Sequence, residues 1–187
     1  MSSISASFRA FPPRFSSSHE YRLAIGTEAI DLPRPFGPYT LTRRLAVGGM
    51  AEVYVAKTQG IGGFEKLLAI KVIHPQYSED EQFVTMLVEE AKLSVLLSHT
   101  NVVQTFDLGC TEDTYFIAME LVEGADCYRM LKALRTRKAV LPLDICAYIV
   151  SAVCSALDYA HRKRDSAGNP LRIVHRDVSP QNVLVSF

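Results

Sequence analysis

The sequence lacks three features that would quickly assign it to a class of protein. Its 20 basic and 20 acidic residues leave no net charge, which argues against a nucleic-acid-binding protein, because such proteins usually carry excess Lys and Arg. None of its four cysteines stands in C-x-x-C spacing, so we expect neither a zinc site nor a disulfide framework. The longest uncharged run of its most apolar region, Ile145–Leu157, has 13 residues, fewer than the ~20 that cross a bilayer. We therefore expect a cytoplasmic protein with reduced thiols and no membrane span in these residues.

Residues 1–36 differ in composition from the rest of the chain. Seven serines occur within the first 18 positions and no acidic residue precedes Glu20, so this stretch cannot bury much apolar surface. We predict a flexible Ser/Pro-rich tail over residues 1–36. An organelle transit peptide, which is also acid-poor and rich in serine, is the alternative interpretation.

From residue 37 the pattern changes to short strands and then helices. Alternation predicts strands over 39–45, 52–57, 67–73, 102–108 and 115–120, and apolar periodicity predicts a long helix over 143–161. An S-x-x-E capping box at Ser78 and Glu81 predicts the start of an earlier helix. The buried stripe of that helix is expected to run from Met86 to Leu97 and to include Glu90. Strands first and helices later predict an α+β fold of two packed lobes.

Two opposite charges stand where lone charges are costly. Lys71 lies in the middle of an apolar strand, and Glu90 lies on the apolar stripe of the next helix. Both are best explained if the ammonium and the carboxylate meet, and such a pair can hold Lys71 toward a phosphate group. Upstream, the small residues of Ala46–Ala51 can bring backbone N–H groups close to phosphate oxygens, although ordinary hairpins are also often glycine-rich.

A third motif lies near the end of the sequence. His175, Arg176 and Asp177, with Asn182 five positions after Asp177, have the H-R-D-x-x-x-x-N spacing of a phosphoryl-transfer loop. In such a loop Asp177 orients the attacking hydroxyl and accepts its proton, and Asn182 is a ligand of magnesium. His175 and Arg176 are expected to brace the loop. The remaining histidines show no partner pattern, and His74 is expected to be exposed.

Together these motifs resemble those of the protein kinase family, most closely the bacterial serine/threonine kinases of eukaryotic type. The resemblance covers residues 39–187 and rests on G-G-M-A-E-V-Y at 48–54, A-I-K at 69–71, E-A at 90–91, M-E-L-V-E-G at 119–124 and H-R-D-V-S-P-Q-N at 175–182. It implies a protein-kinase-like two-lobe fold, with a complete β-rich N-lobe, one regulatory helix and the hinge over 37–123. A partial helical C-lobe is expected over 124–187.

The resemblance also implies ATP and Mg²⁺ as cofactors and assigns residues around them. The candidate catalytic residues are Asp177, Lys71, Glu90 and Asn182, and Asn182 is the candidate metal ligand. Met119 is expected behind the adenine, Glu120 and Val122 at the hinge that bonds its edge, and Asp126 near the ribose. Leu45, Val53, Ala69 and Leu184 are expected to form the apolar walls, and Gly48 and Gly49 the phosphate-binding turn.

The sequence departs from the family pattern in three places. Ala46 and Ala51 stand where the first and third loop glycines usually lie, so positive φ becomes costly and the loop should stiffen. Ser179 replaces the lysine that serine/threonine kinases usually place against the transferred phosphate, which should weaken transition-state stabilisation. The sequence ends before any D-F-G or A-P-E motif.

We therefore expect an ATP-dependent serine/threonine protein kinase, represented by an amino-terminal piece of its catalytic domain that is inactive alone. Its partners would be ATP and a protein hydroxyl, with no nucleic acid. The alternative is a pseudokinase-like module that binds a nucleotide or a partner without catalysis. A small-molecule kinase of similar lobe design fits the hinge and the H-R-D triplet less well.

Overall fold

The computed structural model describes residues 6–8, 31–60 and 63–186. The chain divides into two compact units. Of the described residues, we call 31–60, 63–91 and 106–121 the sheet unit, and 6–8, 92–105 and 122–186 the helical unit. The division after Leu121 lies close to the boundary expected at residue 123. The segment Lys92–Thr105, however, belongs to the helical unit and not to the predicted N-lobe.

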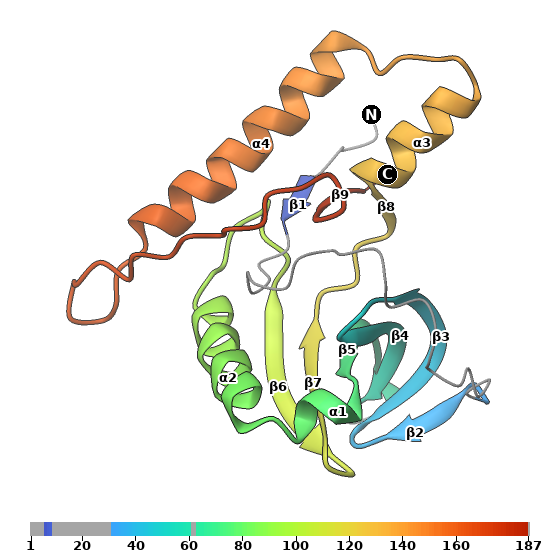
Figure 1. The fold of residues 1–187 in the computed structure, drawn as a ribbon, viewed down its shortest axis with the longest axis vertical. Coiled ribbons are helices and arrows are strands. Elements are labelled where there is room, and N and C mark those ends of the chain that lie inside the picture. The colour runs from blue at the N-terminus through green and yellow to red at the C-terminus, as the bar shows by residue number, and fades with distance from the viewer. Residues whose placement is uncertain (1–5, 9–30, 61–62, 187) are drawn as a thin grey trace. The chain divides into compact units, whose positions relative to one another are not determined.

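The sheet unit is built around six strands (Figure 1). They are β2 (Arg34–Phe36), β3 (Tyr39–Val47), β4 (Ala51–Gln59), β5 (Glu65–Ile73), β6 (Thr105–Thr111) and β7 (Thr114–Met119), in the order β2-β3-β4-β5-β7-β6. Each strand predicted from alternation is present. The strand expected from residue 102 begins only at Thr105, and Val102 and Val103 are buried outside it.

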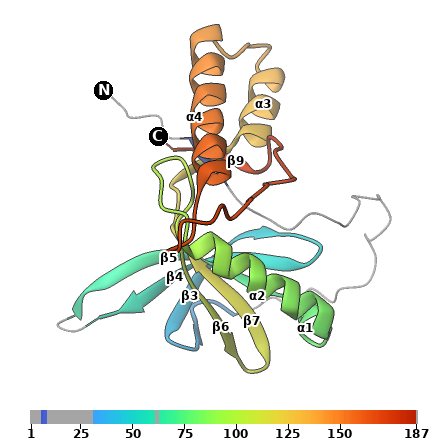
Figure 2. The same ribbon diagram turned by 90° about the vertical axis from the view of Figure 1, so that its left-hand side faces the viewer.

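The register of β4, β5 and β7 defines the two faces of this sheet. Tyr54, Ile70 and Ala118 lie opposite one another across the three strands, so they share one face because side chains alternate along a strand. This face packs into a core with Phe36, Leu41, Ala56, Leu68 and Phe116. The opposite face carries Lys71. Helix α2 (Glu81–Val95) contacts this face and lies beside the sheet in Figure 2.

The start of α2 differs from the prediction. Asp80 caps the helix, since its Oδ1 accepts hydrogen bonds from the backbone N–H groups of Gln82 at 3.0 Å and Phe83 at 3.1 Å. Ser78, the predicted cap, ends the short helix α1 (Pro75–Ser78), and its hydroxyl oxygen accepts from the Tyr115 N–H at 3.5 Å. The negative charge of Asp80 beside the first turn of α2 also interacts favourably with the helix dipole.

The buried stripe of α2 is also displaced by one position. Phe83, Leu87 and Ala91 are buried, at the i, i+4 and i+8 spacing of one helix face. Met86 and Leu93, which were expected on the stripe, are each 37% exposed. The prediction of this stripe was therefore wrong, and Glu90 lies at the edge of the buried face.

Two strands lie inside the stretch predicted as a flexible tail. Strand β2 pairs with β3, and Phe36 is 3% exposed with its ring edge-on to Phe116 at 5.4 Å between centroids. Strand β1 (Ala6–Phe8) pairs antiparallel with β9 (Val183–Ser186). The tail prediction does not hold for these segments. Residues 1–5 and 9–30 lie outside the described residues.

The helical unit combines a small sheet with two helices. The sheet has the order β1-β9-β8, in which β8 is Gly124–Asp126, and the helices are α3 (Cys127–Thr136) and α4 (Leu143–Arg162). Its core comprises Leu97, Val102, Cys127, Ile149, Ala152, Ala156, Ala160, Val183 and Val185. The sequence predicted α4 but neither α3 nor β9.

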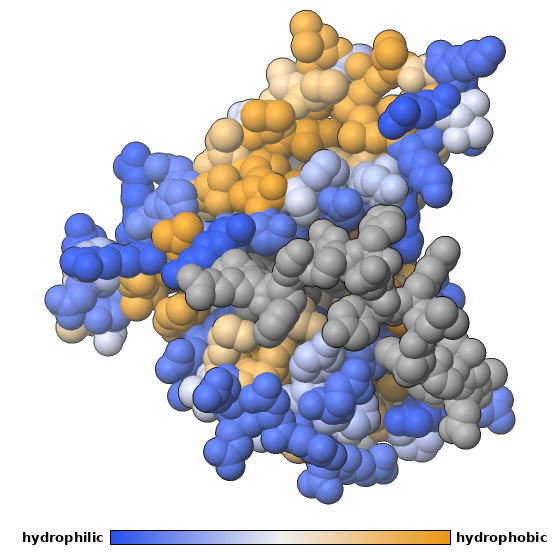
Figure 3. Space-filling view, in the orientation of Figure 1, coloured by the Kyte–Doolittle hydropathy of each residue, from blue (hydrophilic) through white to orange (hydrophobic). Residues whose placement is uncertain are grey.

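Among the described residues, α4 is the helix whose length and apolar composition would suffice to cross a membrane. The core helix of a globular domain meets the same criterion. Helix α4 buries Ile149 and Ala156 in the core of the helical unit, while Leu143 and Val150 are exposed. Figure 3 shows apolar side chains gathered over this helix. Length and composition alone therefore do not make α4 a membrane span.

Candidate active site

Lys71 and Glu90, the charged pair predicted between strand and helix, lie on two elements of the sheet unit that contact each other. Lys71 lies on β5, on the face that α2 contacts, and is 7% exposed. Glu90 lies on α2 and is partly buried. Burial raises the pKa of Glu90 to about 7, and the nearby Lys71 ammonium acts in the opposite direction. The two charges therefore interact, and the Glu90 carboxyl ionises near neutral pH.

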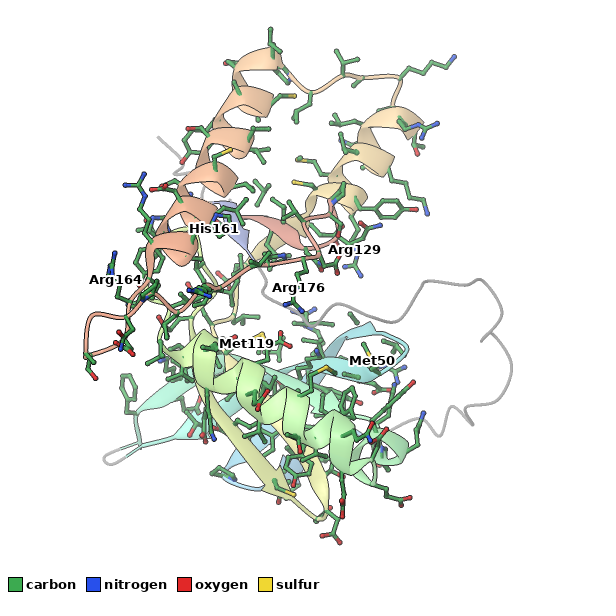
Figure 4. The ribbon with its side chains drawn as sticks, turned by 60° about the vertical axis from the view of Figure 1, so that its left-hand side comes forward. Met50, Met119, Arg129, His161, Arg164 and Arg176 are labelled. Carbon is green, nitrogen blue, oxygen red and sulfur yellow. The ribbon has the colours of Figure 1, made fainter. Side chains whose placement is uncertain are left out.

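The expected phosphate-binding turn joins β3 and β4, where Figure 4 labels Met50. The Gly48 N–H donates to the Ala51 carbonyl at 2.8 Å and closes the turn. His74 follows β5 and contacts the turn twice. Its backbone N–H donates to the Met50 carbonyl at 2.9 Å, and its ring Nε2 lies 3.0 Å from the Gly48 carbonyl oxygen. Because a carbonyl only accepts hydrogen bonds, Nε2 is the donor.

The two alanines of this region do not carry the backbone cost expected of them. Ala46 lies within β3 and Ala51 within β4, where backbone angles are extended. Neither is among the positive-φ residues of the described chain, and neither are Gly48 and Gly49. The expectation that positive φ strains these alanines was therefore wrong.

The apolar residues expected around the adenine lie on several strands. Val53, Ala69 and Met119 are buried on the sheet face that also carries the Lys71 side chain, since Ala69 pairs with Met119 across β5 and β7. Leu45 lies at a register irregularity of β3 and is partly buried. Glu120 follows β7 and is exposed. The sheet unit thus brings two of the expected wall residues, Val53 and Ala69, to one surface together with Met119.

Asp177 and Asn182 contact each other in the loop that precedes β9. The Asn182 Nδ2 donates to the Asp177 carbonyl at 3.0 Å and to its Oδ2 at 2.8 Å. The Asp177 N–H is directed at His175, whose carbonyl and Nδ1 lie at 2.9 and 3.2 Å. The loop closes further through Asn182 N–H and the Ser179 carbonyl at 2.9 Å, and Arg176 adopts a positive φ of 65°. His175 is 9% exposed and braces the loop, as expected.

The acid–amide loop fits a magnesium ion. Because the Asn182 amide nitrogen is used by Asp177, its side-chain oxygen is left as the group that can ligate a metal. The described residues contain no cluster of three or more His, Cys, Asp or Glu, and the four cysteines are free. Magnesium is commonly held by one or two protein oxygens together with water and phosphate oxygens, so a larger cluster is not needed.

Asp126 and Leu184 are opposite each other across β8 and β9. The Asp126 Oδ1 accepts from the Arg129 N–H at 2.7 Å and so caps α3, while its Oδ2 lies 3.2 Å from Arg129 Nε. Figure 4 labels this arginine at the start of α3. Val122 is partly buried before β8. The carboxylate therefore has local partners, and its contact with a ribose stays a prediction.

Sequence reasoning missed two polar contacts near the turn. His74, expected to be exposed, is 8% exposed and holds Gly48. The Tyr54 hydroxyl donates to the Glu52 carboxylate, which also lies 3.7 Å from Arg44. Burial, reinforced by this carboxylate, raises the pKa of Tyr54 to about 12. Strand alternation could have placed Glu52 and Tyr54 on one face, whereas no local pattern indicates the contact of His74.

The comparison with known proteins identifies the family. The protein kinase domain matches residues 39–186, so the chain belongs to the protein kinase domain family, whose members generally use ATP and Mg²⁺. The fold is accordingly kinase-like. The chain is 33% identical to the kinase domain of PknI from Mycobacterium tuberculosis, whose crystal structure it matches with a TM-score of 0.66, over 83% of this chain and 57% of that one.

Two bacterial relatives show how far the similarity extends. The tyrosine-protein kinase MasK of Myxococcus xanthus is 39% identical over 163 residues, which are 86% of this chain and 25% of that protein. The serine/threonine-protein kinase PrkC of Bacillus subtilis is 34% identical over 149 residues, 80% of this chain and 21% of that protein. The chain thus spans about a quarter of the length of the curated relatives it matches.

Proposed function

We propose that the protein transfers the γ-phosphoryl group of MgATP to a serine or threonine hydroxyl of a protein. The observation that carries this proposal is the Asp177–Asn182 contact, in which a carboxylate and an amide are fixed together at the H-R-D-x-x-x-x-N spacing. Phosphoryl transfer needs mainly positioning and charge neutralisation. A loop that holds an acid and a metal ligand in one arrangement supplies both.

Each candidate group has a distinct role in this reaction. Asp177 accepts a hydrogen bond from the substrate hydroxyl and takes its proton. Asn182 ligates magnesium, which when bound neutralises phosphate charge. Lys71 contacts phosphate oxygens, and Glu90 holds its ammonium in place. Gly49 offers a backbone N–H from the turn between β3 and β4.

The choice of hydroxyl is part of the proposal. Two relatives, PrkC and PknI, are named serine/threonine kinases, whereas MasK is named a tyrosine kinase. Phosphoamino-acid analysis of the product separates these possibilities directly. Phosphotyrosine as the main product would overturn serine/threonine specificity while leaving kinase activity intact.

A second candidate is a pseudokinase-like module that binds nucleotide without transferring phosphate. It is favoured by Ser179, which stands where serine/threonine kinases usually carry a lysine. The 187 residues also contain no D-F-G or A-P-E motif, so the proposal assigns turnover to a longer chain and none to these residues alone. We also propose a cytoplasmic location, which the free cysteines support.

The test is a phosphotransfer assay on the full-length gene product with Mg-[γ-³²P]ATP and a generic basic protein substrate. Asp177→Asn should lower the rate at least about 100-fold, because it removes the proton acceptor, and should keep nucleotide binding. Asp158→Asn, which changes an exposed aspartate of α4, is the control and should leave the rate unchanged. Nucleotide binding without any transfer would favour the pseudokinase-like module. Absence of nucleotide binding would exclude the kinase and the nucleotide-binding module, and would leave a pseudokinase-like module that binds only a partner.

A further inference from the structure

His74 is a buried polar residue to which the proposed chemistry gives no role. It follows β5 directly, and the pairing of Ala51 with Ile73 brings it beside the turn between β3 and β4. Its side chain is 8% exposed, and its Nε2 donates to the Gly48 carbonyl at 3.0 Å. Its backbone N–H holds the Met50 carbonyl at 2.9 Å. Two carbonyls of the turn are therefore held by one residue.

The ring contact has a consequence for the next amide. The peptide group that joins Gly48 and Gly49 is planar and trans, so its C=O and N–H point in opposite directions. Fixing the Gly48 oxygen on His74 therefore fixes the direction of the Gly49 N–H. Without a fixed oxygen, this peptide can rotate easily, because neither glycine has a Cβ that restricts φ and ψ.

The Gly49 amide is also the one that is exposed and has no hydrogen-bond partner among the described residues. The Gly48 N–H is already used by the Ala51 carbonyl at 2.8 Å. In the described part of the chain, no hydrogen bond of the Gly49 N–H is recorded, and a Cβ on Gly49 would meet nothing within 4 Å. An exposed backbone N–H with fixed direction is a suitable donor to a phosphate oxygen.

We propose that His74 is a positioning residue of the phosphate-binding turn, which anchors the Gly48–Gly49 peptide so that the Gly49 N–H is presented to a nucleotide phosphate. The proposal rests on the proposed function, since it assumes that the turn receives ATP. The side chain of His74 acts through the peptide and does not contact the nucleotide. If His74 served only the core, its substitution would change stability and leave phosphate recognition unchanged.

Three variants separate these roles. His74→Leu fills the buried space but removes the N–H donor. His74→Gln keeps an N–H donor at similar reach and should restore the anchor. Val72→Ala is the matched control, because Val72 lies on β5, which His74 follows, and packs against the core on the other sheet face. It should lower stability without changing the turn.

The measurement is calorimetric titration of the full-length gene product with MgATP and, separately, with adenosine, which has no phosphate. His74→Leu should weaken MgATP binding about 10-fold, as expected for one hydrogen bond to a charged group. Its affinity for adenosine should stay unchanged, and His74→Gln should recover most of the MgATP affinity. Val72→Ala should lower the melting temperature and leave both affinities as in the wild type.

The outcomes distinguish the role of His74 from the function itself. Equal MgATP affinity in His74→Leu and the wild type would overturn the role of His74 and leave the kinase function standing. An equal loss of MgATP and adenosine affinity would show a general structural role and also overturn it. Wild-type protein that binds neither ligand would refute nucleotide binding and the anchor together. If His74→Leu does not fold, His74→Met, which also lacks an N–H, takes its place.

Discussion

Glu90 provides a prediction that can be followed at a single carboxyl group. Burial raises its pKa to about 7 from an ordinary value of 4.5, even though the Lys71 ammonium acts to lower it. Between these two pH values the folded protein retains a proton that the unfolded chain releases. The free energy of unfolding must therefore decrease as the pH rises through this window, and this stabilising contribution is complete below it and lost above it.

The size of the effect follows from the shift. One proton of difference between the folded and unfolded states changes the free energy of unfolding by about 1.4 kcal/mol per pH unit. Over the window from 4.5 to about 7 the total is at most about 3 kcal/mol. Glu90→Gln removes the titration. The stability of the wild type relative to Glu90→Gln should therefore be highest near pH 5 and decrease toward pH 7.5.

Two measurements check this prediction. A ¹³C NMR titration of the glutamate side chains should show one carboxyl with a midpoint near 7 that disappears in Glu90→Gln. Denaturant unfolding from pH 5 to 7.5 should show the wild type losing stability relative to Glu90→Gln. Glu89→Gln, which changes the exposed neighbour, should leave the high midpoint in place. Parallel stability curves, or a midpoint near 4.5 for Glu90, would refute the reasoning.

Lys71 offers an internal check on the same carboxyl. Because its ammonium lowers the pKa of Glu90, Lys71→Met should move the Glu90 midpoint upward from the wild-type value. A midpoint that stays unchanged would mean that the two charges do not interact. If the pair is needed for phosphoryl transfer, the rate should also decrease as the pH falls below 7. Protonation neutralises the Glu90 carboxylate, which then no longer attracts the Lys71 ammonium.

Two further predictions concern stability. Asp80→Ala should lower the free energy of unfolding by about 1 kcal/mol, because α2 loses its cap. In the same thermal melt, Ser78→Ala should lower the stability less. A larger loss from Ser78→Ala would reverse the assignment of the cap. A Cβ added at Gly109 would collide with the ring of the buried Phe116, so Gly109→Ala should destabilise by about 1–3 kcal/mol. Gly49→Ala, with open space around it, should change the melting temperature far less.

The motif of Asp177 and Asn182 could be recognised in the sequence because its information is local. Asp177 and Asn182 are five positions apart, and their contact depends on the conformation of one short loop. Lys71 and Glu90 were paired for a different reason, because each charge stood in an apolar pattern of the sequence. The burial of Lys71 agrees with that reasoning, whereas Glu90 lies at the edge of the buried face of α2. The strands of the sheet unit likewise follow from alternation over a few residues.

The cap of α2 and the start of α3 could not be predicted, because the local sequence offers more than one candidate for each. The α2 cap had two candidates two residues apart, and the short helix that begins at Pro75 uses Ser78 and leaves Asp80 to cap α2. Which face of α2 is buried is determined by its packing against the sheet, where Phe83 and Leu87 join the core. Helix α3 begins at its own cap, Asp126, within a stretch that the family resemblance marked as hinge and ribose contact. One carboxylate thus had two competing assignments.

The phosphate-binding turn shows why residue identity alone misjudged its backbone. Ala46 and Ala51 stand where the first and third loop glycines of the family usually lie, and the sequence therefore predicted strain at both alanines. The register of β3, β4 and β5 instead places both alanines in extended strands and brings His74 to Gly48, 26 residues away in sequence. The conformation of this turn is therefore determined by a long-range hydrogen bond as well as by its own glycines. Any change that shifts the end of β5 relative to β4 should reorient the Gly49 amide, even though it alters no residue of the turn.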